Sequence, residues 1–150
     1  MRERLLVIVG GERIALAVDG VRQVVTDVRI HPLPEHFGAV AGFVSLRGRV
    51  ATAVDLGRCL GHGPAPAGRA RCAVVVRRAG EDYALLVDDV EDLCEPAADP
   101  LGADAAAALA PRWRELVRAV HRLEDGLVAE VDLDRLLDAA RLGEAVEERA

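Results

Sequence analysis

The chain has 150 residues, of which 51% are hydrophobic and only 3% aromatic, and its formal net charge is −6. This length suits one compact domain with an aliphatic core. An acidic chain with scattered basic residues lacks the positive surface of a nucleic-acid binder. No apolar run approaches the ~20 residues that span a bilayer, and the first residues lack the features of a signal peptide. We expect a cytoplasmic protein without direct membrane insertion.

Alternation of apolar and polar residues with period two, broken by turn residues, predicts that the chain is mainly β. Gly10-Gly11 and Gly48 stand where tight turns would join two strands. Residues 61–70, rich in Gly, Pro and Ala, predict a surface connection. The expected hairpins comprise residues 5–9 with 14–18, 40–46 with 50–56, and 73–76 with 83–87.

Helical spacing appears twice near the C-terminus. The run that begins at Leu133 keeps one apolar face, and Asp132 or Asp134 can cap its start. The Ala-rich residues 103–119 also predict a helix. The apolar residues at helical spacing in and directly after this range are Trp113, Leu116, Val117 and Val120.

The two halves of the sequence resemble each other. Residues 14–25 align with residues 83–94 at a constant offset of 69, and five of the twelve positions are identical. Residues 42–60 align without a gap with residues 119–137 at an offset of 77. Composition alone rarely produces ordered blocks of this kind, so we expect a duplicated half-domain. A unit of about 70 residues is too long for a solenoid repeat and suits a small closed β structure.

The repeat predicts a single domain, residues 1–150, built from two pseudo-duplicated subdomains. We place them at approximately residues 14–68 and 69–131, with the N-terminal strand and the C-terminal helix free to cross between them. Two matched pairs carry specific expectations. Val54 and Val131 are expected to face equivalent cores, and Asp55 and Asp132 to cap the turn that follows each of them.

No arrangement of side chains predicts catalysis or metal binding. The histidines and cysteines lack the spacing of metal ligands, and an odd number of cysteines does not fit a disulfide framework. No nucleophile motif or phosphate-binding glycine loop occurs. The histidines are His31, His36, His62 and His121, and the cysteines are Cys59, Cys72 and Cys94. We expect each histidine to lie in a surface loop or to be a satisfied polar residue, and the cysteines to be small buried side chains. We expect no enzyme, and neither cofactor nor metal.

Residues 42–50 admit two interpretations. They could form an ordinary hairpin whose arginines point to water. Alternatively, Arg47, held on a tight turn at Gly48, would present a planar fork of donors to a partner's carboxylate or carbonyl groups.

Taken in order, these segments resemble the CheW family of chemotaxis coupling proteins. The first half of the resemblance comprises residues 13–18, 21–25, 30–34, 42–50 and 54–56, and the second half comprises residues 86–90, 123–128 and 131–133. It covers roughly residues 4–138. Ser45 stands where the family usually has Asn before Leu-Arg-Gly.

The resemblance implies a non-catalytic adaptor with two five-stranded β-barrels around a common hydrophobic core. Such an adaptor bridges the cytoplasmic tips of chemoreceptors to a CheA-type histidine kinase, and barrel-to-barrel contacts can build rings or arrays. A shallow apolar groove between the barrels would accept a receptor helical hairpin. The resemblance assigns receptor contact and the supporting hairpin to Val21, Val24, Gly42, Val44, Leu46, Arg47 and Gly48. The alternatives are a small-molecule-binding β-barrel and an adaptor in a non-flagellar receptor–kinase pathway.

Overall fold

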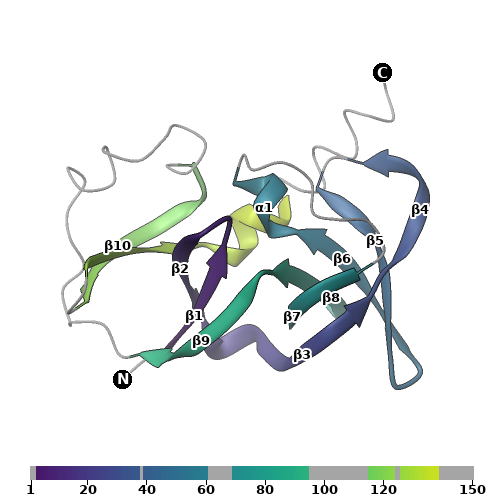
Figure 1. The fold of residues 1–150 in the computed structure, drawn as a ribbon, viewed down its shortest axis with the longest axis horizontal. Coiled ribbons are helices and arrows are strands. Elements are labelled where there is room, and N and C mark those ends of the chain that lie inside the picture. The colour runs from purple at the N-terminus through teal and green to yellow at the C-terminus, as the bar shows by residue number, and fades with distance from the viewer. Residues whose placement is uncertain (1–2, 38, 61–68, 95–114, 124–125, 139–150) are drawn as a thin grey trace.

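Two β-sheets make up most of the computed structural model, which describes residues 3–37, 39–60, 69–94, 115–123 and 126–138 (Figure 1). One sheet has five strands in the order β10-β11-β2-β1-β9, and the other has six in the order β3-β7-β8-β6-β5-β4. The elements are β1 (Arg4–Val9), β2 (Glu12–Ala17), η1 (Val18–Gly20), β3 (Val21–Arg29), β4 (His31–Phe37), β5 (Val40–Leu46), β6 (Arg49–Asp55), α1 (Leu56–Cys59), β7 (Arg69–Arg78), β8 (Glu81–Val87), β9 (Asp89–Cys94), β10 (Val117–Leu123) and β11 (Gly126–Val131). The mainly β fold with short helices is confirmed, and residues 133–138 are helical as expected.

Each sheet takes strands from both halves of the sequence. In the six-stranded sheet, β6 pairs in parallel with β8, and in the five-stranded sheet β11 pairs in parallel with β2. Strands from both residues 14–68 and residues 69–131 therefore contribute to both sheets. The two copies of the repeat are interlocked rather than placed side by side.

The internal repeat is confirmed at the level of single residue pairs. Val54 lies opposite Leu85 in one parallel pair, and Val131 lies opposite Leu16 in the other. The offset of 77 relates Val54 to Val131, and the offset of 69 relates Leu85 to Leu16. The two pairs are therefore equivalent in the sequence alignment. Val54 and Val131 are each 1% exposed in the core between the two sheets, called here the shared core.

Matched aspartates begin the short helices that follow these strands. The side chain of Asp55 accepts a hydrogen bond from the backbone N–H of Arg58 at 3.3 Å. The side chain of Asp132 accepts the equivalent bond from Arg135 at 3.1 Å. Each carboxylate satisfies a donor that the first helical turn leaves free. The predicted capping role is confirmed in both halves.

The helix predicted over residues 103–119 is wrong from Val117 onward, because residues 117–123 form β10. The pairing of β10 with β11 shifts between Val117 and Ala119. This irregularity lets Val117 and Val120, three residues apart, both reach the shared core. A β-bulge therefore imitates helical spacing. Residues 103–114, including Trp113, lie outside the described residues.

Candidate docking surface and polar clusters

The β5–β6 hairpin carries most of the predicted site residues, and two of them support it from inside. Val44 is 3% exposed. It lies in an aliphatic cluster on the face of the six-stranded sheet opposite to the shared core, called here the inner face of that sheet. Gly42 has a φ of 149°, and a Cβ there would overlap the carbonyl oxygen of His31 and lie 2.9 Å from Pro32 Cα. These two residues fix the hairpin rather than face solvent.

Arg47 and Gly48 form the two-residue turn of this hairpin, because Leu46 pairs directly with Arg49. Their φ angles are 48° and 82°, as a type I′ turn requires. Arg47 is exposed, whereas Leu46 is half-buried against the aliphatic cluster. The predicted turn at Gly48 is confirmed, and it holds the Arg47 guanidinium at the tip of the hairpin.

Val21 and Val24 lie elsewhere, on β3, which β7, β8 and β6 separate from β5 in the sheet order. Val21 packs against the shared core, and Val24 is 42% exposed. Their counterparts at the offset of 69 are Val90, which also packs against the shared core, and Leu93, which is 50% exposed. Sequence reasoning missed Val90 and Leu93, although the repeat carried the signal that finds them.

These four residues, Val21, Val24, Val90 and Leu93, are called here the edge surface. β3 pairs with β7 and β9 pairs with β1, at the ends of the two sheets, and β9 also contacts β7. Both strands run along the lower side of the molecule as drawn in Figure 1. Partly exposed aliphatic side chains from both halves thus border one region of the shared core.

A cluster around Asp82 connects the hairpin tip with β3. The carboxylate accepts a hydrogen bond from Arg77 Nε at 2.9 Å and lies 3.5 Å from Arg49 Nε, next to the turn. The hydrogen bond from Arg77, aided by the charges of Arg77, Arg49 and Arg22, holds the pKa of Asp82 below its ordinary value. Sequence reasoning had placed Asp82 in a connecting loop, but β7 and β8 continue to within two residues of each other.

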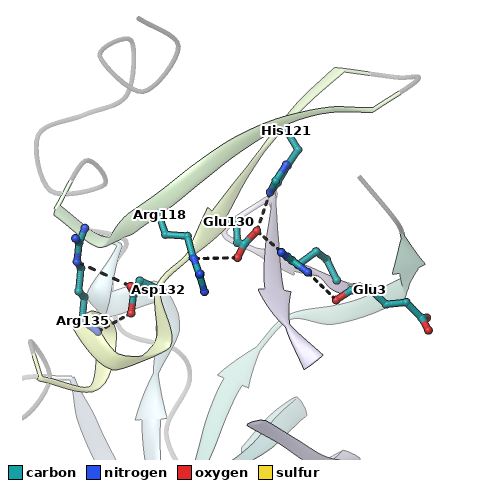
Figure 2. A network of polar contacts seen from close by, with 7 residues as sticks. Glu3, Arg118, His121, Glu130, Asp132 and Arg135 are labelled. Carbon is teal, nitrogen blue, oxygen red and sulfur yellow. Dashed lines mark hydrogen bonds and ion pairs between the residues drawn. The ribbon is translucent and has the colours of Figure 1, made fainter. Parts of the chain in front are cut away.

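A second polar cluster is buried inside the five-stranded sheet (Figure 2). The Oε1 atom of Glu130 accepts a hydrogen bond from Arg4 Nε at 2.6 Å and contacts His121 Nε2 at 2.7 Å, while Arg118 Nε lies 3.6 Å from Oε2. The Glu130 side chain is 1% exposed and the His121 side chain 6%. His121 is therefore not in a surface loop but is a buried polar residue paired with Glu130 through Nε2.

The electrostatics of Glu130 reflect two opposed effects. Burial alone raises the pKa of this carboxyl, but the hydrogen bonds from Arg4 and His121 and the charges of both groups outweigh it. The pKa of Glu130 therefore lies below its ordinary value. Among the described residues, Glu130 Oε2 and His121 Nδ1 are buried without a hydrogen-bond partner.

A cavity of about 560 Å³ lies between η1, the end of β7 and the start of the C-terminal helix. Half of its lining residues are charged, and each of its four arginines lies near a carboxylate. The pairs are Arg77 with Asp82, Arg78 with Asp134 and Asp138, Arg118 with Glu130, and Arg135 with Asp132. Sites for small molecules are mostly apolar with a few convergent polar groups. This cavity does not favour the small-molecule alternative.

Within the described residues, no cluster of three or more potential metal ligands occurs and no helix has the length and hydrophobicity to cross a membrane. Cys72 is buried as expected, whereas Cys59 and Cys94 are partly exposed.

Comparison with known proteins gives one family match. The model of the CheW-like domain matches residues 3–141. Among solved structures, the crystal structure of the scaffolding protein TtCheW from Thermoanaerobacter tengcongensis is similar, with a TM-score of 0.69 and 22% sequence identity. The similarity covers 90% of this chain and 91% of that chain. No curated protein sequence matches.

Proposed function

The chain belongs to the CheW-like domain family, and from that premise we propose that it is a non-catalytic adaptor in chemotaxis-type signal transduction. In this proposal it acts in the cytoplasm and couples the tips of chemoreceptors to a CheA-type histidine kinase. The observation that carries the proposal is the recurrence of exposed aliphatic side chains at matched positions of the repeat. Val24 and Leu93 are 42% and 50% exposed, and Val50 and Leu127 are 64% and 57% exposed.

The edge surface suits the receptor. Its partly exposed side chains, Val24 and Leu93, lie beside half-buried Val21 and Val90, so a partner can cover aliphatic groups on a foundation that is already packed. A helix that lays its apolar face on such a surface needs only a few anchors. Exposed large apolar side chains that gather in this way mark interaction sites more often than single ones do.

The hairpin ends suit a partner of similar fold. Val50 lies on β6 beside the Arg47–Gly48 turn, and Leu127 occupies the matched place on β11. The two sites belong to different sheets, so one adaptor can contact two neighbouring barrels at once. Signalling contacts of this kind can each bury less than ~1,200 Å², and an array compensates for weak contacts through multivalency.

Co-sedimentation with a receptor cytoplasmic fragment and a CheA-type kinase tests the edge surface. We expect Val24→Asp to abolish receptor binding, because it places a charge where a partner's apolar face must dock. Gln23→Asp is the matched control, because Gln23 is an exposed neighbour on the same strand whose pairing with Val75 directs it to the other face. Equal binding by both variants would remove the edge surface from the proposal.

The hairpin tip is tested by Arg47→Ala. We expect binding in the ternary mixture to weaken by on the order of fivefold, about 1 kcal/mol, with nearly unchanged thermal unfolding because Arg47 is exposed. Arg29→Ala, another exposed arginine, is the control. A pull-down from the native cytoplasm would identify the pathway, flagellar or not. Recovery of neither receptor nor kinase, together with a metabolite that raises the Tm, would favour the small-molecule alternative.

A further inference from the structure

Charges are reversed between matched positions of the repeat beside the edge surface. The offset of 69 relates Arg22 to Glu91 and Asp82 to Arg13. Glu91 Oε1 accepts a hydrogen bond from Arg13 Nε at 2.7 Å. At the matched positions, the positive charge of Arg22 contributes to lowering the pKa of Asp82. Each of these pairings joins a residue of one half to a residue of the other, and the signs of the charges are reversed between them.

The reversal extends along both strands. β3 contains two arginines and one aspartate, a net charge of +1, whereas β9 contains three carboxylates and no basic residue, a net charge of −3. Arg22 stands between Val21 and Val24, and Glu91 between Val90 and Leu93, where the pairing with the neighbouring strand is irregular. Both residues are exposed.

This asymmetry matters because the aliphatic part of the edge surface is nearly two-fold symmetric. Val21 and Val24 on one side match Val90 and Leu93 on the other, so apolar contacts alone would accept a two-helix partner in either of two opposite orientations. Only a feature that differs between the halves can distinguish these orientations. Charge distribution typically sets register and specificity in an interface more than it sets affinity.

We propose that Arg22 and Glu91 determine the orientation in which a two-helix partner docks on the edge surface. The partner helix with acidic side chains lies against β3, and the helix with basic side chains lies against β9. The inference rests on the proposed receptor docking and adds a specificity rule to it. Because both groups are exposed, their effect weakens as salt shortens the Debye length, which is about 10 Å at 0.1 M.

Photo-cross-linking of the full chain tests this rule. Cys59, Cys72 and Cys94 are replaced by alanine, and Thr26→Cys on exposed β3 carries a benzophenone. The probe is a helical-hairpin fragment of a chemoreceptor tip, and mass spectrometry of digested products gives the ratio of cross-links to its two helices. Thermal unfolding confirms that each variant is folded.

We expect the parent chain to cross-link mainly to one helix. In the variant R13E/R22E/E91R, which retains an ion pair at position 91, the ratio of the two cross-links is expected to shift roughly tenfold toward the other helix at low salt. R29E changes the charge of the same strand without altering the residue between Val21 and Val24, and it should leave the ratio unchanged.

The outcomes separate the two proposals. Binding without preference between the helices, or a ratio that the triple variant does not move, would overturn the orientation rule while receptor docking stands. A ratio that R29E moves equally would also overturn it, because net charge alone would then be sufficient. Absence of cross-links and of co-sedimentation with the parent chain would overturn receptor docking and the orientation rule together.

Discussion

The inner faces of the two sheets have matched backbones but different chemistry. In the six-stranded sheet this face is an aliphatic cluster, whereas in the five-stranded sheet the described residues provide three buried apolar side chains and the Glu130 cluster. The offsets of 69 and 77 pair Ala73 with Arg4, Ala41 with Arg118, Val44 with His121, and Ala53 with Glu130. One strand register therefore supports either an aliphatic interior or a network of ion pairs.

This difference distinguishes two nearly identical hairpins during folding. If β11 took the place of β6 beside β8, Glu130 would lie against Ala84 without Arg4. His121 and Arg118 lie on β10 and would move with Glu130, so the loss would be that of the Arg4 ion pair. Breaking a buried ion pair costs several kcal/mol, whereas an intact one has little net effect on stability. We infer that the cluster contributes to the choice of partner strand more than to the free energy of unfolding.

The largest effect is expected from removing the centre of the cluster. Glu130→Ala leaves Arg4 and His121 in a buried site without their carboxylate, so it should lower the free energy of unfolding by about 3–5 kcal/mol. Urea unfolding measures the change. A loss below ~1 kcal/mol would show that water already reaches these groups.

A variant that replaces the polar cluster with the side chains found at the matched positions of the other half makes the Glu130→Ala test more specific. The variant R4A/H121V/E130A removes both charges of the main ion pair, so no buried ion is left alone. We expect it to be more stable than Glu130→Ala. If the triple variant were the less stable of the two, the cluster would contribute net stability, contrary to the interpretation above.

A smaller and equal effect is expected in the shared core, where the halves do not differ. Val54→Ala and Val131→Ala each delete two buried methyl groups and should destabilise the protein by roughly 1–3 kcal/mol. The Tm of each variant is the measurement. A loss confined to one variant would contradict the equivalence of the two positions.

The helix caps should show a still smaller symmetric effect. Asp55→Ala and Asp132→Ala each remove one side-chain acceptor, at a cost of about 1 kcal/mol in chemical unfolding. Asp134→Ala is the control, because Asp134 is an exposed residue of the same first turn whose partner is Arg78 rather than a backbone amide. Equal losses in all three variants would argue against a specific capping contribution.

The smallest expected effect is a change in how the free energy of unfolding depends on pH. The pKa of Glu130 is lowered in the folded protein, so its contribution is complete above the unfolded value of about 4.3 and is lost as pH falls through the folded value. The stability difference between wild type and Glu130→Gln should therefore narrow in acid. Ala53→Ser, at the matched position, carries no titrating group and should show a constant difference.

The sequence correctly predicted the features that occur once in each half, because each local pattern appears in two copies that can be compared. Matched Val-Asp-Leu segments predicted the strand ends and both caps, and turn residues located the hairpins. The same repeat also exposes the error in β10. Residues 42–46, predicted as a strand, align with residues 119–123, so helical spacing at Val117 and Val120 conflicted with the alignment.

The Glu130 cluster could not be predicted in the same way. Arg4 and Glu130 are 126 positions apart, and they meet because β1 and β11 both pair with β2. Local pattern and turn chemistry do not specify which distant strands become neighbours. The available signal was the alignment of polar residues with apolar ones, Glu130 with Ala53 and His121 with Val44. The docking role of Arg47, Val21 and Val24 stays a prediction of the family resemblance.

The parallel contacts of β6 with β8 and of β11 with β2 have a consequence for any shortened version of this polypeptide. A fragment holding a single copy of the repeat would lack the neighbour that each of these strands requires, so it should be unable to fold as a monomer. Two such fragments could satisfy each other by reciprocal strand exchange, which would give a symmetric homodimer. The present chain has the architecture that fusion of those two subunits would produce.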